Sequence, residues 1–117
     1  MAEVTSAAYQ DLRDYIEANW THIEIRDDVG TPLFRLPLSD SRVSWEHSPG
    51  AQTLILRVDL AGSDTEIDGN RPLTIAGSAL FKVASGGSAF SVEMWSAFTF
   101  VDAADTCIVR HRVEVPQ

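Results

Sequence analysis

From Thr21 onward, apolar and polar residues alternate with a period of two, and this alternation limits the possible folds more than any other feature of the chain. Successive side chains of a strand point to opposite faces of a sheet, so the alternation predicts strands with one buried face. It is clearest at residues 23–25, 43–45, 54–60, 90–100 and 107–115. In the fourth of these runs, one face is expected to carry Phe90, Val92, Met94, Phe98 and Phe100.

Turn-forming residues separate these runs, at residues 27–30, 48–50, 68–69, 85–87 and 102–105. Short strands interrupted this regularly predict a mainly β fold, a β-sandwich or partly closed barrel of about seven or eight antiparallel strands. Tight turns are expected at residues 29–31 and 85–88, where Gly86 and Gly87 allow the positive φ of a hairpin turn. A phosphate-binding glycine loop is the weaker alternative, because such a loop precedes a helix and here a strand follows.

One amphipathic helix is expected before the strands, at about residues 6–19, with Thr5 or Ser6 as its cap. Its apolar positions fall three or four residues apart: Ala8, Tyr9, Leu12, Tyr15, Ile16 and Trp20. The opposite side is polar: Gln10, Asp11, Arg13, Asp14 and Glu17. The aromatic stripe either covers the protein's own core or forms a docking face for a partner, and the first interpretation is favoured.

Two parts of the chain resemble each other. IEIRDDVGTPLFRL aligns with LFKVASGGSAFSV, which places Gly30 on Gly86 and Phe34 on Phe90, and TLILR later aligns with TCIVR. The order of these parts predicts two β units, at about residues 21–60 and 73–115, joined by an acidic connection at about residues 61–72. Each unit is expected to be a hairpin followed by two further strand passes. True duplication and chance likeness between strand patterns both remain open, and in either case the units are expected to cover each other within a single domain, residues 1–117.

The charge and cysteine content narrow the classes of partner. The chain has 17 acidic and 9 basic residues among its 117, so it would repel a phosphate backbone, and no nucleic-acid partner is expected. Cys107 is the one cysteine and lies in an alternating run, where a small buried apolar residue is expected; a reducing compartment fits. No apolar stretch is long enough to span a bilayer, and no membrane partner or targeting segment is expected.

The chemically interesting residues do not assemble into a recognisable catalytic motif. Asp64, Glu66 and Asp68 followed by Gly69 copy the first half of a calcium loop, but Ile75 stands where the bidentate glutamate belongs. The three histidines lie on separate segments without the close spacing of a zinc site, and His111 alternates with valines, so it is expected to face the core or an interface. No serine stands in a nucleophile motif. We therefore expect no cofactor, no metal and no enzymatic activity.

A segment near the C-terminus resembles known proteins. SALFKVASGGSAFSVEMWSAFTF, closed by TCIVRHRVEVPQ, is similar to the strand, Gly-Gly turn and strand found in many small structural proteins of tailed bacteriophages. The likeness extends to the N-terminal helix and to IEIRDDVGTPLFRL. The resemblance implies a virion component assembled in the host cytoplasm: a capsid decoration or cement protein, or alternatively a neck or tail protein. It also implies other virion proteins and further copies of the chain as partners, hence a homo-oligomer.

A structural subunit of this kind works through surface patches rather than pockets. The candidate interface residues lie on the helix and on the last strand: Tyr9, Leu12, Tyr15, Ile16, Arg110, His111 and Arg112. A different class of function is a small binding module for carbohydrate or peptide, in which Trp20, Trp45 and Trp95 would be stacking platforms. Exposed tryptophans gathered on one face would favour the module, and buried ones would favour the structural subunit.

Overall fold

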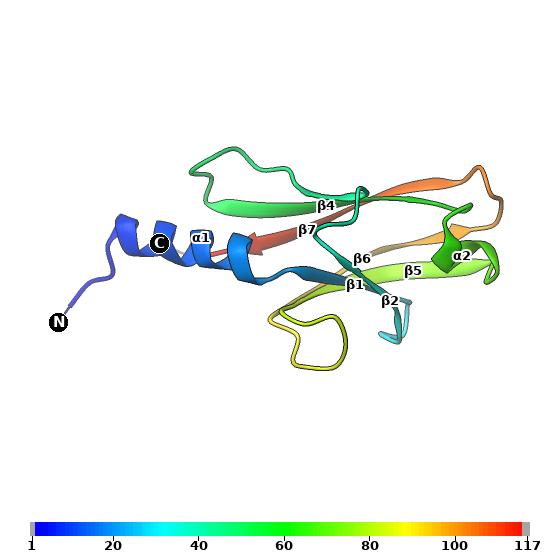
Figure 1. Ribbon diagram of the computed structural model, residues 1–117, viewed down its shortest axis with the longest axis horizontal. Coiled ribbons are helices and arrows are strands. Elements are labelled where there is room, and N and C mark those ends of the chain that lie inside the picture. The colour runs from blue at the N-terminus through cyan, green and yellow to red at the C-terminus, as the bar shows by residue number, and fades with distance from the viewer. Residues whose placement is uncertain (1, 116–117) are drawn as a thin grey trace.

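Two antiparallel sheets form the body of the protein (Figure 1). The computed structural model describes residues 2–115, which form two helices and seven strands. In chain order the elements are α1 (Ser6–Asn19), β1 (His22–Arg26), β2 (Pro32–Pro37), β3 (Val43–Trp45), β4 (Thr53–Ala61), α2 (Thr65–Asp68), β5 (Leu73–Phe81), β6 (Ser91–Phe100) and β7 (Thr106–Glu114). The four-stranded sheet has the order β2-β1-β5-β6 and the three-stranded sheet the order β3-β4-β7. The expected mainly β fold, with one N-terminal helix and seven antiparallel strands, is confirmed.

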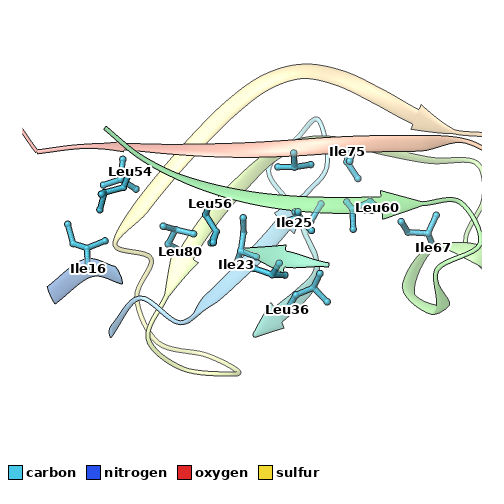
Figure 2. Packing of buried hydrophobic residues seen from close by; sticks show 14 of the residues in the cluster. Ile16, Ile23, Ile25, Leu36, Leu54, Leu56, Leu60, Ile67, Ile75 and Leu80 are labelled. Atoms are coloured by element: carbon cyan, nitrogen blue, oxygen red, sulfur yellow. The ribbon is translucent and has the colours of Figure 1, made fainter. Parts of the chain in front are cut away.

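The core lies between the inner faces of the two sheets (Figure 2). Along β4 every second residue is buried, from Leu54 to Leu60, as the alternation predicts. From the other sheet, Ile23 and Ile25 of β1 and Leu80 of β5 are fully buried. Side chains of two stacked sheets that interdigitate in this way exclude water from both faces, and this burial is the main term that stabilises the fold.

The two predicted units are arranged with an approximate two-fold relation. Their hairpins, β1–β2 and β5–β6, meet through antiparallel pairing of β1 with β5, and the TLILR and TCIVR strands, β4 and β7, pair antiparallel in the other sheet. The expectation of two further strand passes after each hairpin is wrong for the second unit. Residues 91–100 form one continuous strand, so within residues 2–115 the second unit has no strand equivalent to β3.

The face predicted for residues 90–100 is also wrong. Phe100 is buried and Phe98 packs against the core, but Phe90, Val92 and Met94 are exposed on the outer face of the four-stranded sheet. The physical reason is a register shift: Ile75 pairs with Phe98 and Gly77 with Met94, so Ala76 alone lies opposite three residues of β6. A bulge of this kind changes which side chains point inward, and the bulge itself cannot be predicted from the alternation of apolar and polar residues.

Of the two predicted tight turns, the one near residues 29–31 is present in the structure and the one at residues 85–88 is not. Between β1 and β2, Asp27 accepts hydrogen bonds from the backbone N–H groups of Val29 and Thr31, and Gly30 has a φ of 83°. Gly86 and Gly87 also have positive φ, 66° and 75°. However, β5 ends at Phe81 and β6 begins at Ser91, so the glycines lie in a long loop, residues 82–90, and not in a tight turn.

α1 begins and ends where the sequence predicts, and Thr5 caps it by accepting the N–H of Ala8. Its position is unusual, because its N-terminal half extends beyond the end of the sandwich (Figure 1). Figure 2 shows Ile16 at the end of the core that Leu54 occupies. The long axis of the molecule is consequently 55 Å, against 26 and 25 Å for the other two.

Candidate protein-binding surface

The apolar stripe of α1 is wider than the part of the sandwich that packs against the helix. Arg13 and Ile16 are buried, with Tyr9 and Trp20 half-buried on the same side of the helix. Leu12 and Tyr15 are each 49 % exposed, and so is much of Val4, just before the helix. Ala8, Leu12 and Tyr15 recur at intervals of four and three residues and therefore form one line along the helix; together with Val4, in the extended segment before the Thr5 cap, we call them the helix row.

A second group of exposed apolar side chains lies on the outer face of the four-stranded sheet. Val92 is 53 % and Met94 55 % exposed, and Phe90 just precedes them at the end of the 82–90 loop. We call these three residues the strand row. β6 is an edge strand, so one side of this row is open to a partner.

Lys82 joins the two rows. Its Nζ atom lies 2.6 Å from the hydroxyl oxygen of Tyr15 and 4.9 Å from the ring centres of both Tyr15 and Phe90. Phe90 in turn stacks on Trp20 at the end of α1, with ring centres 5.6 Å apart. The helix row and the strand row are thus parts of one continuous surface, the apolar strip. Within residues 2–115, the ammonium group at its centre has aromatic neighbours and no carboxylate partner.

Arg35 fastens the glycine loop that carries Lys82 and Phe90. Its Nη1 atom donates to the carbonyl oxygens of Val83 and Gly86, both at 2.9 Å. Its guanidinium lies 3.5 Å from the ring centre of Phe81 and pairs with Glu24 at 2.6 Å. The loop is therefore held against the outer face of the sheet, and Gly86 serves there as a hydrogen-bond acceptor for the protein itself.

The predicted interface residues separate into three groups. Leu12 and Tyr15 lie in the apolar strip, with Tyr9 half-buried beside them. Arg110 and Arg112 lie on the outer face of the three-stranded sheet, where Arg110 donates to Glu46 at 2.7 Å and Arg112 pairs with Glu93 of β6 at 3.9 Å. The prediction is wrong for Ile16 and His111, because both are buried in the core and cannot contact a partner. Sequence reasoning missed the strand row, because period-two alternation assigned it to the buried face.

The sequence predicts that His111 faces either the core or an interface. In the structure it lies in the core. Its Nδ1 atom is 2.6 Å from the hydroxyl of Ser78 and its Nε2 atom 2.8 Å from the hydroxyl of Ser91, so it connects the two sheets. Burial lowers the pKa of the imidazole to about 4. A fully buried, neutral histidine between two serines is suited to holding the sheets together, and no substrate can reach it.

The carboxylates of the half calcium motif form ion pairs with arginines. Arg42 contacts Asp40, Asp64 and Glu66 at 2.8, 3.2 and 2.8 Å, and Asp68 pairs with Arg71. Hydrogen bonds from Arg42 hold the pKa of Asp40 at about 2 and lower that of Glu66. Within residues 2–115, no three metal-binding side chains come together as a site.

The tryptophans do not form an exposed platform. Trp20, Trp45 and Trp95 are each partly buried against the core; Trp20 directly follows α1, and the other two lie on β3 and β6. Trp45 lines a cavity of about 240 Å³ with Asp14, Glu17 and His47, beneath the loop between β3 and β4. A groove of about 520 Å³ runs between the edge strands β6 and β7, beside Trp95 and Arg112. None of the helices formed by the described residues has the length and apolarity needed to cross a membrane.

The chain matches no protein-family model, no curated protein and no solved structure.

Proposed function

We propose that the protein is a non-enzymatic structural component of a tailed-bacteriophage virion, a capsid decoration or cement protein, that acts by binding other proteins through the apolar strip. The observation that carries the proposal is the strip itself, two rows of largely exposed apolar side chains that meet at Lys82 and that residues 2–115 leave uncovered. The similarity of residues 78–100 and 106–117 to small phage structural proteins supports the virion as the place where it works.

A stable monomer rarely exposes a surface of this kind. Contiguous exposed apolar patches mark contact sites, because covering them removes apolar area from water. Covering a large side chain that is already half-buried contributes roughly 1 kcal/mol. The large residues of the strip together therefore support a contact of modest strength, which suits a subunit present in many copies on one particle.

Two alternatives remain as outcomes of the same experiment. A neck or tail component would use the strip in the same way but bind a different part of the virion. A carbohydrate or peptide module is less well supported, because all three tryptophans pack against the core.

The test is co-sedimentation of the purified protein with assembled capsids and, separately, with tails of the phage that encodes it, at low and moderate salt. We expect saturable binding to capsids. Val92→Asp and Met94→Asp place a charge in the strand row and should weaken binding at least tenfold, about 1.4 kcal/mol or more. Ile108→Asp is the matched control, because Ile108 is similarly exposed on the other sheet.

Binding to tails alone would move the protein to the tail. Absence of binding to either particle, a strictly monomeric mass at high concentration and a saturable response to a sugar or peptide would together replace the virion proposal with the binding module.

A further inference from the structure

The projecting half of α1 needs a cover that residues 2–115 do not supply within one molecule. A 14-residue helix is marginal in water unless its apolar side is packed, and the buried residues of α1, Arg13 and Ile16, both lie in its C-terminal half. The helix row is the largely exposed remainder, and its helical part, from Ala8 to Tyr15, spans about 10 Å at the helical rise. Spacings of four and three residues are those that pack one helix against another.

The charges on α1 define which partner fits. The exposed ionisable residues of the projecting part are acidic, Glu3 and Asp11, whereas Asp14 lines the cavity beside Trp45 and His47 and Arg13 is 2 % exposed. Lys82 lies at the opposite end of the row, against Tyr15. The helix row therefore has negative charge near its N-terminal end and positive charge near Tyr15. Two copies in antiparallel orientation bring these opposite charges together.

We propose that two copies of the chain associate through their helix rows in antiparallel orientation, with Glu3 of each copy facing Lys82 of the other. In this orientation Leu12 packs near the small Ala8 of the second copy, and Tyr15 packs near its Val4. A parallel pair would instead bring the two acidic tips together and the two lysines together, which costs free energy in a molecule of net charge −8. The inference names the partner for one part of the apolar strip and rests on the proposed function only in treating that strip as a contact surface.

The dimer has a consequence for attachment. Because the helix rows are used between the copies, both strand rows stay free, and the dimer presents two of them. A two-site attachment exceeds a single contact in overall strength without any new contact type.

The test is sedimentation equilibrium of the full chain and five variants, with circular dichroism to confirm that each is folded. The wild type is expected to form a concentration-dependent dimer. Lys82→Glu and Glu3→Lys should each raise the dissociation constant about tenfold, because each replaces two attractive pairs with repulsive ones. The double variant E3K/K82E exchanges the charges and should restore dimerisation. Leu12→Asp should abolish it, and Ile108→Asp is the control that should leave it unchanged.

A wild type that stays monomeric at several hundred micromolar overturns the inference, and so does a dimer that survives Leu12→Asp or a double variant no better than the singles. If the wild type is monomeric and Leu12→Asp abolishes capsid binding, the helix row binds a virion protein instead of a second copy. Capsid binding without dimerisation leaves the proposed function standing, and dimerisation without capsid binding overturns that function alone.

Discussion

His111 illustrates how much one residue contributes when it is buried between two sheets. It is the point at which β7 bonds to both β5 and β6, through Ser78 and Ser91, and the indole N–H of Trp95 donates to the Ser78 hydroxyl. Every polar atom of the imidazole has a partner, which offsets much of the cost of taking the ring out of water.

The depressed pKa of His111 makes folding stability depend on pH. The pKa falls from the usual 6.5 to about 4 on folding, so the unfolded chain binds more protons between these values. Stability is therefore full above about pH 6.5 and falls as the pH drops toward 4, by about 2 kcal/mol between pH 7 and 5. Urea denaturation at pH 7, 6 and 5 measures this loss.

His111→Gln is the comparison for that measurement, since it keeps a polar side chain without a titrating group. The variant should be less stable at pH 7 and nearly flat between pH 7 and 5. Asp40 and Glu66, whose pKa values are lowered, affect stability only at more acidic pH, so they do not obscure this window. Equal wild-type stability at pH 7 and pH 5 would show that the histidine is not held neutral by the fold.

At the scale of single elements, the connection between β4 and β5 shows why a half motif does not make a site. Residues 61–72 contain the short helix α2, which the sequence analysis did not predict. The turn is closed by Asp64, which accepts the N–H of Ala61 at 2.9 Å, and Arg42 neutralises Asp64 and Glu66. The carboxylates that a calcium ion would need are already satisfied by the protein.

We accordingly expect no calcium dependence of folding. An ion that binds the folded state must raise the melting temperature, in proportion to the logarithm of its concentration over its dissociation constant. In millimolar calcium the melting temperature should shift by less than about 1 °C, and magnesium at the same ionic strength is the control. A rise of several degrees that reverses with chelator would contradict the expectation.

The two halves of α1 differ in what they contribute to the whole molecule. The C-terminal half packs Ile16 into the core, whereas the N-terminal half extends past the sandwich (Figure 1). The buried contacts of the helix therefore lie in its C-terminal half.

Removal of residues 2–8 should affect attachment more than folding. The deletion removes Val4, Ala8 and the Thr5 cap, and the loss of a cap costs about 1 kcal/mol of unfolding free energy. Ile16→Ala, in the packed half, should cost about 3 kcal/mol. Capsid binding of the deletion variant should nevertheless fall at least tenfold. Chemical denaturation and co-sedimentation measure the two effects, and a deletion that destabilises as much as Ile16→Ala would show that the projecting half supports the fold.

Local sequence patterns predicted some features of the tertiary structure but not others. Period-two alternation and the capped amphipathic stretch determined the mainly β class, the span of α1 and the inward face of β4, because each depends on neighbours within a few residues. The positive φ of Gly30, Gly86 and Gly87 could likewise be expected from glycine at turns.

Only the tertiary structure decided which apolar residues stay uncovered. The bulge opposite Ala76 moves Val92 and Met94 to the outer face, and the end of the sandwich leaves Leu12 and Tyr15 exposed while Ile16 is covered. Both outcomes depend on strand pairing and on the extent of the sheets, which join residues far apart in the sequence. The periodicity of a helix or strand records that a side chain is apolar and on which side of its element it lies, but not whether another element reaches that side.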